Sequence, residues 1–122
     1  MKKLLVFFEI PAADFGRAVN FYETILNVKT SVYDCENEKM ACFPEEEGVC
    51  PGAISYAPGF LPSANGVLVS LNCDDMEATH ALIVANGGKI VIPKTKIEAE
   101  GRGFFSTFID SEGNTIGLYS DK

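Results

Sequence analysis

The sequence has little of what several classes of protein require. It contains ten lysine and arginine residues against seventeen aspartate and glutamate residues, and its net charge of −7 excludes the basic surface that nucleic acid binding needs. No apolar run approaches the roughly 20 residues of a membrane span. A single histidine, His80, and four cysteines without a Cys-x-x-Cys pair leave few ligands for zinc. We therefore expect neither a nucleic acid nor a membrane as partner.

The cysteines and the N-terminus both favour a cytoplasmic protein. The four cysteines follow no regular spacing and stand at Cys35, Cys42, Cys50 and Cys73. We expect them to be reduced, partly buried thiols. Lys2 and Lys3 precede an apolar stretch, but Glu9 and Pro11 interrupt it, so we do not expect a secretory signal. The 122 residues suffice for one domain with a real core.

The stretch 4–27 has the pattern of a strand followed by an amphipathic helix. Residues 4–10 are aliphatic and aromatic and predict a buried strand. Asp14 can cap the helix, because its carboxylate accepts hydrogen bonds from the free N–H groups of the first turn. Apolar residues then recur at three- and four-residue spacing up to Asn27, which tolerates the left-handed conformation of a helix end.

The same order occurs a second time, with Asp75 lying 61 residues after Asp14. Residues 67–72 predict another short strand, Asp74 and Asp75 supply a cap, and a helical pattern runs to Asn86. A repeat of half the chain indicates two copies of one supersecondary unit, since a solenoid needs at least three repeats.

Each copy continues with three further strands. We expect them at 28–33, 39–43 and 52–56 in the first copy, and at 89–92, 104–109 and 115–120 in the second. Pro93 should end the strand at 89–92. Gly113 should take a positive φ in the turn 110–114. The acidic run 45–47 predicts a solvated loop.

We therefore predict an α+β fold of two tandem βαβββ modules in a single domain over residues 1–122. The first module covers about 1–58, a linker rich in turn-forming residues covers 59–66, and the second module covers about 67–122. Two four-stranded sheets side by side should form a curved mixed sheet with a concave trough, with the helices on the outer face.

Two segments of the chain resemble a known superfamily. The segments DFGRAVNFYETIL at 14–26 and DSEGNTIGLYS at 110–120, within paired βαβββ modules, are similar to the vicinal oxygen chelate superfamily of glyoxalases, extradiol dioxygenases and bleomycin-resistance proteins. The resemblance covers essentially the whole chain and implies the same fold. It does not select a reaction, because members carry out different chemistry in the same trough.

The resemblance also indicates where a metal would be held. Metal-dependent members use histidines and glutamates on the strands that line the trough. The corresponding positions in this chain are Phe7, Ile54 or Ser55, Leu68 and Gly117. None carries an imidazole or a carboxylate, and His80 falls in the second helix, where we expect a surface side chain. We therefore expect no metal ligand and no cofactor.

Side-chain alternation along the strands predicts what lines the trough instead. Glu9 falls on the same strand face as Phe7, and Thr115 and Tyr119 fall on the same strand face as Gly117. Glu9 should be a buried carboxylate that acts on a ligand as the one catalytic candidate, or one that forms an internal ion pair; alternatively, its side chain snorkels to solvent near the strand end. Arg102 is either an anion-binding arm over the trough or a solvated loop residue. The predicted ligand-binding set is Phe7, Glu9, Tyr56, Arg102, Thr115 and Tyr119.

Three functions stay open at this point. The first is a cytoplasmic, metal-independent protein of the bleomycin-resistance type that binds a small organic molecule. The second is a metal-dependent lyase similar to lactoylglutathione lyase, or a dioxygenase, with ligands at other positions. The third is a non-catalytic interaction protein with a vestigial trough. Open sheets with exposed edges favour a homodimer, as superfamily relatives of this length do. The sequence does not identify the ligand.

Overall fold

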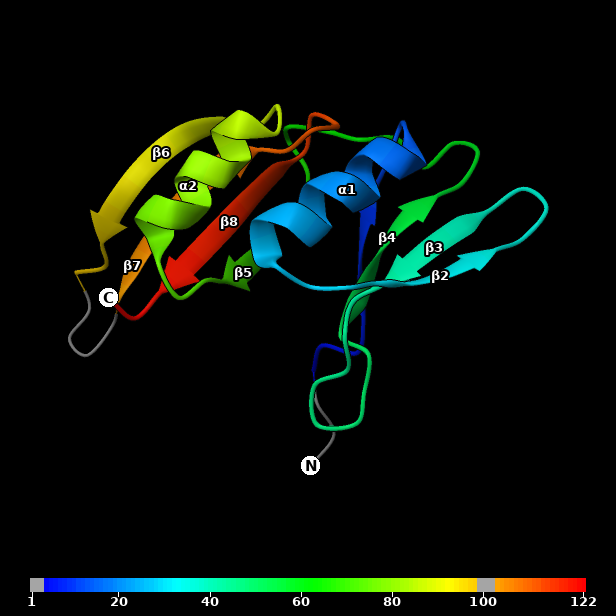
Figure 1. Ribbon diagram of the computed structural model, residues 1–122, viewed down its shortest axis with the longest axis horizontal. Coiled ribbons are helices and arrows are strands. Elements are labelled where there is room, and N and C mark those ends of the chain that lie inside the picture. Colours follow the sequence, from blue (N-terminus) through cyan, green and yellow to red (C-terminus); the bar gives the residue numbers. More distant parts are fainter. Residues whose placement is uncertain (1–3, 99–102) are drawn as a thin grey trace.

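The computed structural model describes residues 4–98 and 103–122, which form two βαβββ modules (Figure 1). The first module contains β1 (Phe8–Pro11), α1 (Phe15–Leu26), β2 (Ser31–Asp34), β3 (Lys39–Cys42) and β4 (Gly52–Tyr56). The second contains β5 (Ser70–Asn72), α2 (Met76–Ala85), β6 (Lys89–Lys96), β7 (Phe104–Ile109) and β8 (Thr115–Ser120). The predicted α+β class and the tandem modules are confirmed.

Each module folds into one four-stranded mixed sheet. The strand orders are β1-β4-β3-β2 and β5-β8-β7-β6, so the two sheets have the same topology. In each sheet the first strand pairs in parallel with the last, and the other pairings are antiparallel. Within the described ranges no strand of one sheet is hydrogen-bonded to a strand of the other. The two sheets therefore lie side by side rather than merging into one ladder.

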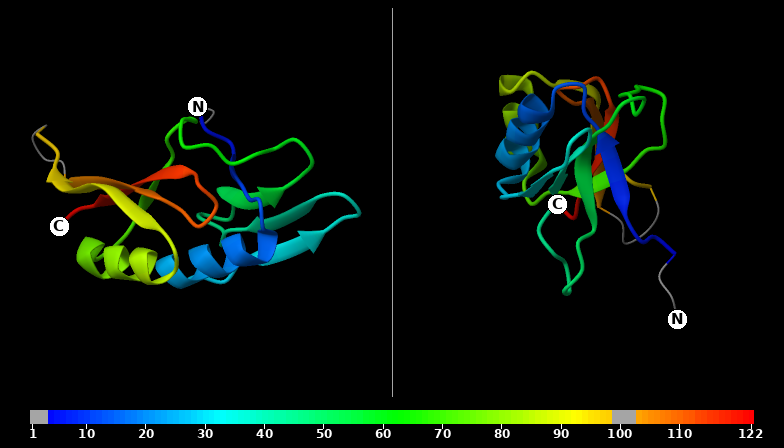
Figure 2. Two further views of the ribbon diagram at one scale, coloured as in Figure 1. Left: turned by 90° about the horizontal axis from the view of Figure 1, so that it is seen from above. Right: turned by 90° about the vertical axis from the view of Figure 1, so that its right-hand side faces the viewer.

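Both helices lie on the same side of the two sheets (Figure 2). α1 contacts β4 and α2, and α2 contacts β6 and β8, so the helices join the two modules. One apolar cluster fills the space between helices and sheets, and its largest fully buried side chains include Phe21, Tyr22, Phe108, Ile83 and Leu118. In the part of the chain that the structure describes, the opposite faces of both sheets carry no helix.

The helix ends follow the capping residues that the sequence predicts. The Asp14 carboxylate accepts a hydrogen bond from the Arg17 backbone N–H at 3.1 Å, and Asn27 ends α1 with φ 53°. The Asp75 carboxylate accepts from the Ala78 N–H at 3.1 Å. These contacts satisfy N–H groups that have no partner within the first turn of a helix. They explain why both helices begin where the sequence places them.

Several strands differ from the predicted ranges. The expected strand 4–10 is wrong at its start. The pairing of β1 with β4 begins at Phe8 and Gly52, so residues 4–7 have no partner in β4. The expected strand 67–72 likewise begins only at Ser70. Pro93 does not end β6, which continues to Lys96. β6 lies at the edge of its sheet and shifts register on both sides of Ile92, and proline is tolerated in such positions.

The closing turn between β7 and β8 ties the second module to the first. The side chain of Glu112 is fully buried, and its Oε1 accepts hydrogen bonds from the backbone N–H groups of Ala13 and Asp14 at 2.9 and 2.7 Å. Its Oε2 accepts from Nε of Arg17 at 2.7 Å. Burial raises the pKa of the Glu112 carboxyl, but the bonds from Arg17, from the Asp14 backbone and from Ser111 outweigh it, so the pKa lies below its usual value.

Asp110 and Asn114 complete this connection. The hydroxyl of Tyr22 on α1 donates to Oδ2 of Asp110 at 2.5 Å, and both side chains are buried. Nδ2 of Asn114 donates to the carbonyl of Pro11 at 2.9 Å, and its Oδ1 accepts from the backbone N–H of Ser63 at 3.0 Å. Gly113 takes the predicted positive φ, 100°. The turn that the sequence marks as a hairpin therefore joins the two modules.

Candidate functional site

The face of the first sheet that points away from α1 is the candidate functional surface. Ile10 and Ile54 are adjacent partners on β1 and β4 and belong to the core beneath α1. Because side chains alternate along a strand, Glu9 and Ser55 point to the opposite face. The connector that follows β4 runs on this same side, away from the helices (Figure 2). We call this surface the open face.

Glu9 is held in position by the side chain of Ser55. Its Oε1 accepts a hydrogen bond of 2.7 Å from the hydroxyl of Ser55, which is only 4% exposed. The prediction that Glu9 is buried is wrong, because β1 is an edge strand and the Glu9 side chain is exposed on the open face. Among residues 4–98 and 103–122 no lysine or arginine forms an ion pair with Glu9.

A cavity of about 350 Å³ opens beside Glu9 on the first sheet. Its walls include the rings of Tyr33 and Phe60, the thioether of Met40 and the hydroxyl of Ser55. Tyr33 and Met40 are paired residues of β2 and β3, and Met40 in turn pairs with Ser55 on β4. We call this space the Glu9 cavity. It combines one positioned carboxylate with a largely apolar surface.

A second cavity of about 450 Å³ lies where the two modules meet. Phe7, Glu9 and Thr115 line it, together with apolar residues of the connector that include Phe60 and Val67. We call it the junction cavity. Glu9 and Phe60 line both cavities, so the two spaces open on either side of these residues.

The structure therefore brings some of the predicted ligand-binding residues together and separates others. Glu9 and Tyr56 line the Glu9 cavity, and Phe7, Glu9 and Thr115 line the junction cavity. Tyr119 lines neither of them, and its hydroxyl donates to Oδ1 of Asp121 at 3.0 Å. Arg102 lies outside the described residues.

Several cavity residues were missed by the sequence analysis, among them Tyr33, Met40 and Phe60. Tyr33 stands in a strand whose alternation was visible, but nothing in the sequence shows which face of that strand is open. Met40 lies on the neighbouring strand, and the sequence likewise does not show which face of that strand is open. Phe60 belongs to the connector, where no periodicity exists to place a side chain. Only the pairing of β2 with β3 and the path of the connector bring these residues together.

The positions that would hold a metal in the family do not form a ligand set. Ile54 is fully buried on the helix side, so Ser55 is the residue of that pair on the open face. A side-chain carbon on Gly117 would lie 2.4 Å from Oγ of Ser70, so this part of β8 is closely packed. Within the described part of the chain, no three histidine, cysteine, aspartate or glutamate side chains are grouped to hold a metal ion. The residues present do not fit a resident metal.

His80 lies apart from the open face. Its Nε2 is 2.8 Å from Oγ of Ser106, which is fully buried in the second sheet. The expected surface position is therefore wrong, since the ring is half-buried between α2 and β7. Burial lowers the pKa of the imidazole, which favours its neutral form.

Two of the thiols, those of Cys42 and Cys50, lie close together. The Cys42 thiol is within hydrogen-bonding reach of Cys50, and Cys50 donates to the carbonyl of Gly52 at 3.3 Å. Burial, followed by the contact with Cys50, raises the pKa of Cys42. A raised pKa lowers the thiolate fraction, so Cys42 is a poor nucleophile at neutral pH.

Comparison with known proteins supports one family. The model of the glyoxalase/bleomycin resistance protein/dioxygenase superfamily matches residues 4–118. Comparison with curated proteins gave no match. No helix within residues 4–98 and 103–122 has both the length and the apolar character needed to cross a membrane.

Solved structures show the same fold at low sequence identity. A glyoxylase/bleomycin resistance protein/dioxygenase domain from Frankia sp. EAN1pec superposes with a TM-score of 0.75 at 11% identity, covering 100% of both chains. A glyoxalase/bleomycin resistance protein from Albidiferax ferrireducens T118 gives 0.69 at 16%, covering 97% of this chain and 98% of the other. Glyoxalase I from Zea mays gives 0.70 at 18% and covers 96% of this chain, which spans only 46% of the maize protein.

Proposed function

Because the chain belongs to the glyoxalase/bleomycin resistance protein/dioxygenase superfamily, we propose that it binds a small organic molecule on its open face without a metal, as bleomycin-resistance proteins do. The observation that carries this proposal is the lining of the two cavities around Glu9. Both are largely apolar, and Glu9 is a carboxylate that they share.

The chemistry of the open face favours binding over metal catalysis. Zinc and similar cations need three or four imidazole or carboxylate groups that converge at about 2.0–2.3 Å. The family positions supply Phe7, Ser55, Leu68 and Gly117 instead. The cavity volumes of about 350 and 450 Å³ fall in the range of roughly 300–1,000 Å³ typical of small-molecule sites.

Elemental analysis of protein purified without chelator tests the metal-independent part of the proposal. We expect well under one zinc, nickel, manganese or iron per chain, and no rise in melting temperature when these ions are added. Stoichiometric metal that is lost in Glu9→Gln would contradict the proposal. It would favour the metal-dependent lyase, which the similarity of fold to maize glyoxalase I keeps as the second candidate.

The ligand-binding part is tested by NMR of the labelled protein with a set of small organic fragments. We expect chemical-shift changes to concentrate on residues of the open face, such as Glu9, Met40 and Thr115. A fragment set that leaves these amides unchanged would instead favour a non-catalytic interaction protein with a vestigial trough.

We also propose that the protein forms a homodimer, and this is supported by exposed apolar residues beside the junction cavity. Leu4, Leu5 and Val6 are 103, 67 and 79% exposed, and Val67 is 91% exposed. Patches of this kind commonly mark protein interfaces. The cytoplasmic location stays a prediction from the sequence.

A further inference from the structure

We propose that the Glu9 cavity takes an organic cation, a substituted ammonium group carried on an apolar body. The inference rests on the proposed function, because it assigns a ligand class to the same open face. It follows from three features of the cavity: an exposed carboxylate that is fixed in position, an excess of negative charge, and aromatic walls.

The Glu9 carboxylate has capacity for a further donor. An ionised carboxylate can accept about four hydrogen bonds, whereas in the described ranges Glu9 accepts one, from Ser55. Because Ser55 is buried, its hydroxyl orients the carboxylate from below and leaves the solvent side free. An ammonium group would contact the carboxylate there, through a charge-assisted hydrogen bond where it carries a hydrogen and through charge attraction alone where it is quaternary.

The charges around the cavity select against an anion. Glu38, in the turn after β2, is a second carboxylate of the lining. Lys39 is the one basic residue among the lining residues. Strand alternation places Lys39 and its partner Tyr56 on the side of Ala41, which belongs to the core beneath α1, so both residues border the cavity only at its rim. With two carboxylates, Glu9 and Glu38, and one ammonium group in its lining, the cavity carries an excess of negative charge.

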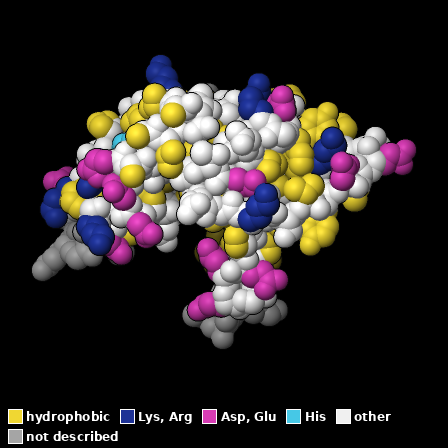
Figure 3. All heavy atoms as spheres, viewed as in Figure 1, with side chains coloured by type: hydrophobic (Ala, Val, Ile, Leu, Met, Phe, Trp, Pro, Cys, Tyr) yellow, Lys and Arg dark blue, Asp and Glu magenta, His cyan; other side chains and the backbone are white. Residues whose placement is uncertain are grey.

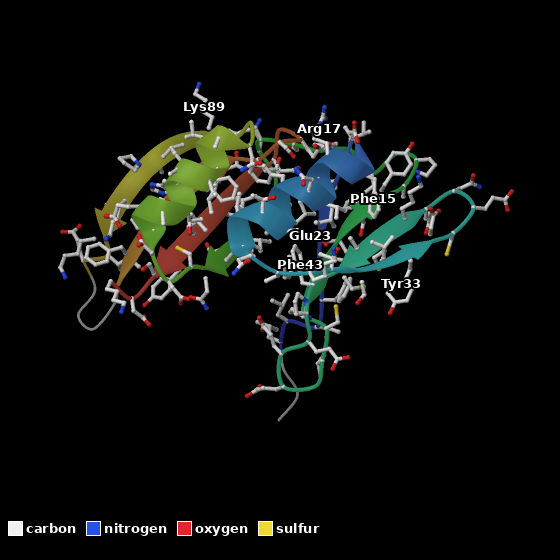
Figure 4. All side chains as sticks on the ribbon, in the orientation of Figure 1. Phe15, Arg17, Glu23, Tyr33, Phe43 and Lys89 are labelled. Atoms are coloured by element: carbon white, nitrogen blue, oxygen red, sulfur yellow. The ribbon has the colours of Figure 1, made fainter. Side chains whose placement is uncertain are left out.

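The walls suit the apolar part of such a ligand. The rings of Tyr33 and Phe60 and the thioether of Met40 border the space, with Tyr56 at its rim. Tyr33 projects from β2 on the side away from α1 (Figure 4). A cation near the face of an aromatic ring gains about 0.5–2 kcal/mol from the ring quadrupole, more as it loses water. A carboxylate beside such rings is the arrangement that an organic cation needs.

The test compares three probes of similar size: benzyltrimethylammonium, neutral benzyl alcohol and the anion benzenesulfonate. Binding is followed by NMR titration of the full chain. We expect benzyltrimethylammonium to shift amides around Glu9, Met40 and Ser55 and to bind about tenfold tighter than benzyl alcohol. Its affinity should fall as salt is added, because the carboxylate is exposed to solvent. Benzenesulfonate should not bind at this cavity.

Two variants locate the effect, and one provides the control. Glu9→Gln keeps the acceptor for Ser55 but removes the charge, and Tyr33→Leu removes one ring. Each should weaken benzyltrimethylammonium by about tenfold. Glu36→Gln removes one charge from the exposed turn outside the cavity lining and should leave the affinity unchanged.

Each alternative outcome is distinct. Equal binding of the neutral and cationic probes at the Glu9 cavity would overturn the inference and leave the proposed function standing. Equal losses in Glu36→Gln and Glu9→Gln would reduce the effect to net charge and also overturn it. No shift from any probe, together with a silent fragment set, would overturn both the inference and the proposed function.

Discussion

Single residues of the closing turn decide how the two modules are joined. Asp110 and Glu112 are both acidic, yet they make different contacts: Asp110 accepts a bond from the Tyr22 hydroxyl, and Glu112 accepts bonds at the start of α1. The sequence analysis identified the turn but not these roles. The partners lie 88 to 99 positions away along the chain, and no local pattern reports a contact at that separation.

Tyr22→Phe should destabilise the protein by about 1–3 kcal/mol, because it leaves the buried Asp110 carboxylate without one of its donors. Urea denaturation followed by circular dichroism measures the change. Tyr33→Phe serves as the control, since Tyr33 is exposed and should change the free energy of unfolding little. Equal effects of the two changes would show that the Asp110 contact does not contribute.

The stability of the protein should fall in acid partly through Glu112. The folded-state pKa of this carboxyl lies below the ordinary value of 4.5, so the unfolded chain binds the proton more readily. The contribution of Glu112 is therefore complete above pH 4.5 and is lost as the pH falls from there toward the folded value.

Urea midpoints measured across this range test the prediction. Glu112→Gln should lower stability at neutral pH and flatten the decline below pH 4.5. Glu36→Gln, an exposed change of equal charge, should keep the wild-type slope. An unchanged slope in Glu112→Gln would rule out this role.

At the scale of elements, the helices could be predicted closely and the strands less so. A helix start depends on its own cap, so Asp14 and Asn27 bound α1 from local information alone. A strand end depends on a neighbour. Residues 4–7 have a strand-like sequence, but β4 begins too late to pair with them. Pro93 has no backbone N–H, which ends a strand only where that N–H must bond to a neighbouring strand. Because β6 lies at a sheet edge, it can continue through the proline.

The cap of α2 offers a matched pair of neighbouring aspartates. Asp75→Ala removes the acceptor for the Ala78 N–H and should cost about 0.5–2 kcal/mol. Asp74→Ala changes an adjacent exposed carboxylate that does not cap the helix, and it should cost much less. Thermal unfolding of both variants and of Asp75→Asn, which retains an acceptor, makes the comparison. A larger effect at Asp74 would contradict the assigned cap.

At the scale of the whole molecule, the sequence analysis predicted a trough but not its composition. Side-chain alternation predicted that Glu9 shares a strand face with Phe7. Whether Glu9 is buried depends on the neighbouring strands, and the sequence of β1 alone does not predict these. The acidic residues 45–47 lie in the loop between β3 and β4, which projects from the body of the molecule (Figure 1), and acidic side chains gather on this projection (Figure 3). Leu5 and Val49 line a hollow beside this loop together with Glu46, so apolar and acidic groups border the same space.

This exposed region leads to a prediction about assembly. Sedimentation should show a species of twice the chain mass of 13.2 kDa at micromolar concentration. Leu5→Glu should shift it toward the monomer, because it places a charge in the exposed apolar patch. Val84→Glu makes the same kind of change on the exposed side of α2 and should leave the mass unchanged. A wild-type mass of about 13 kDa would contradict the dimer.

The turn at 110–114 also bears on how the chain reaches its folded state during synthesis. The first turn of α1 needs the Glu112 carboxylate, so a nascent chain that has emerged only as far as β4 lacks the acceptor for the N–H groups of Ala13 and Asp14. Contacts across nearly the full length of the chain carry a high loop-closure cost and slow folding. The first module therefore lacks these contacts until the turn at 110–114 has been synthesised.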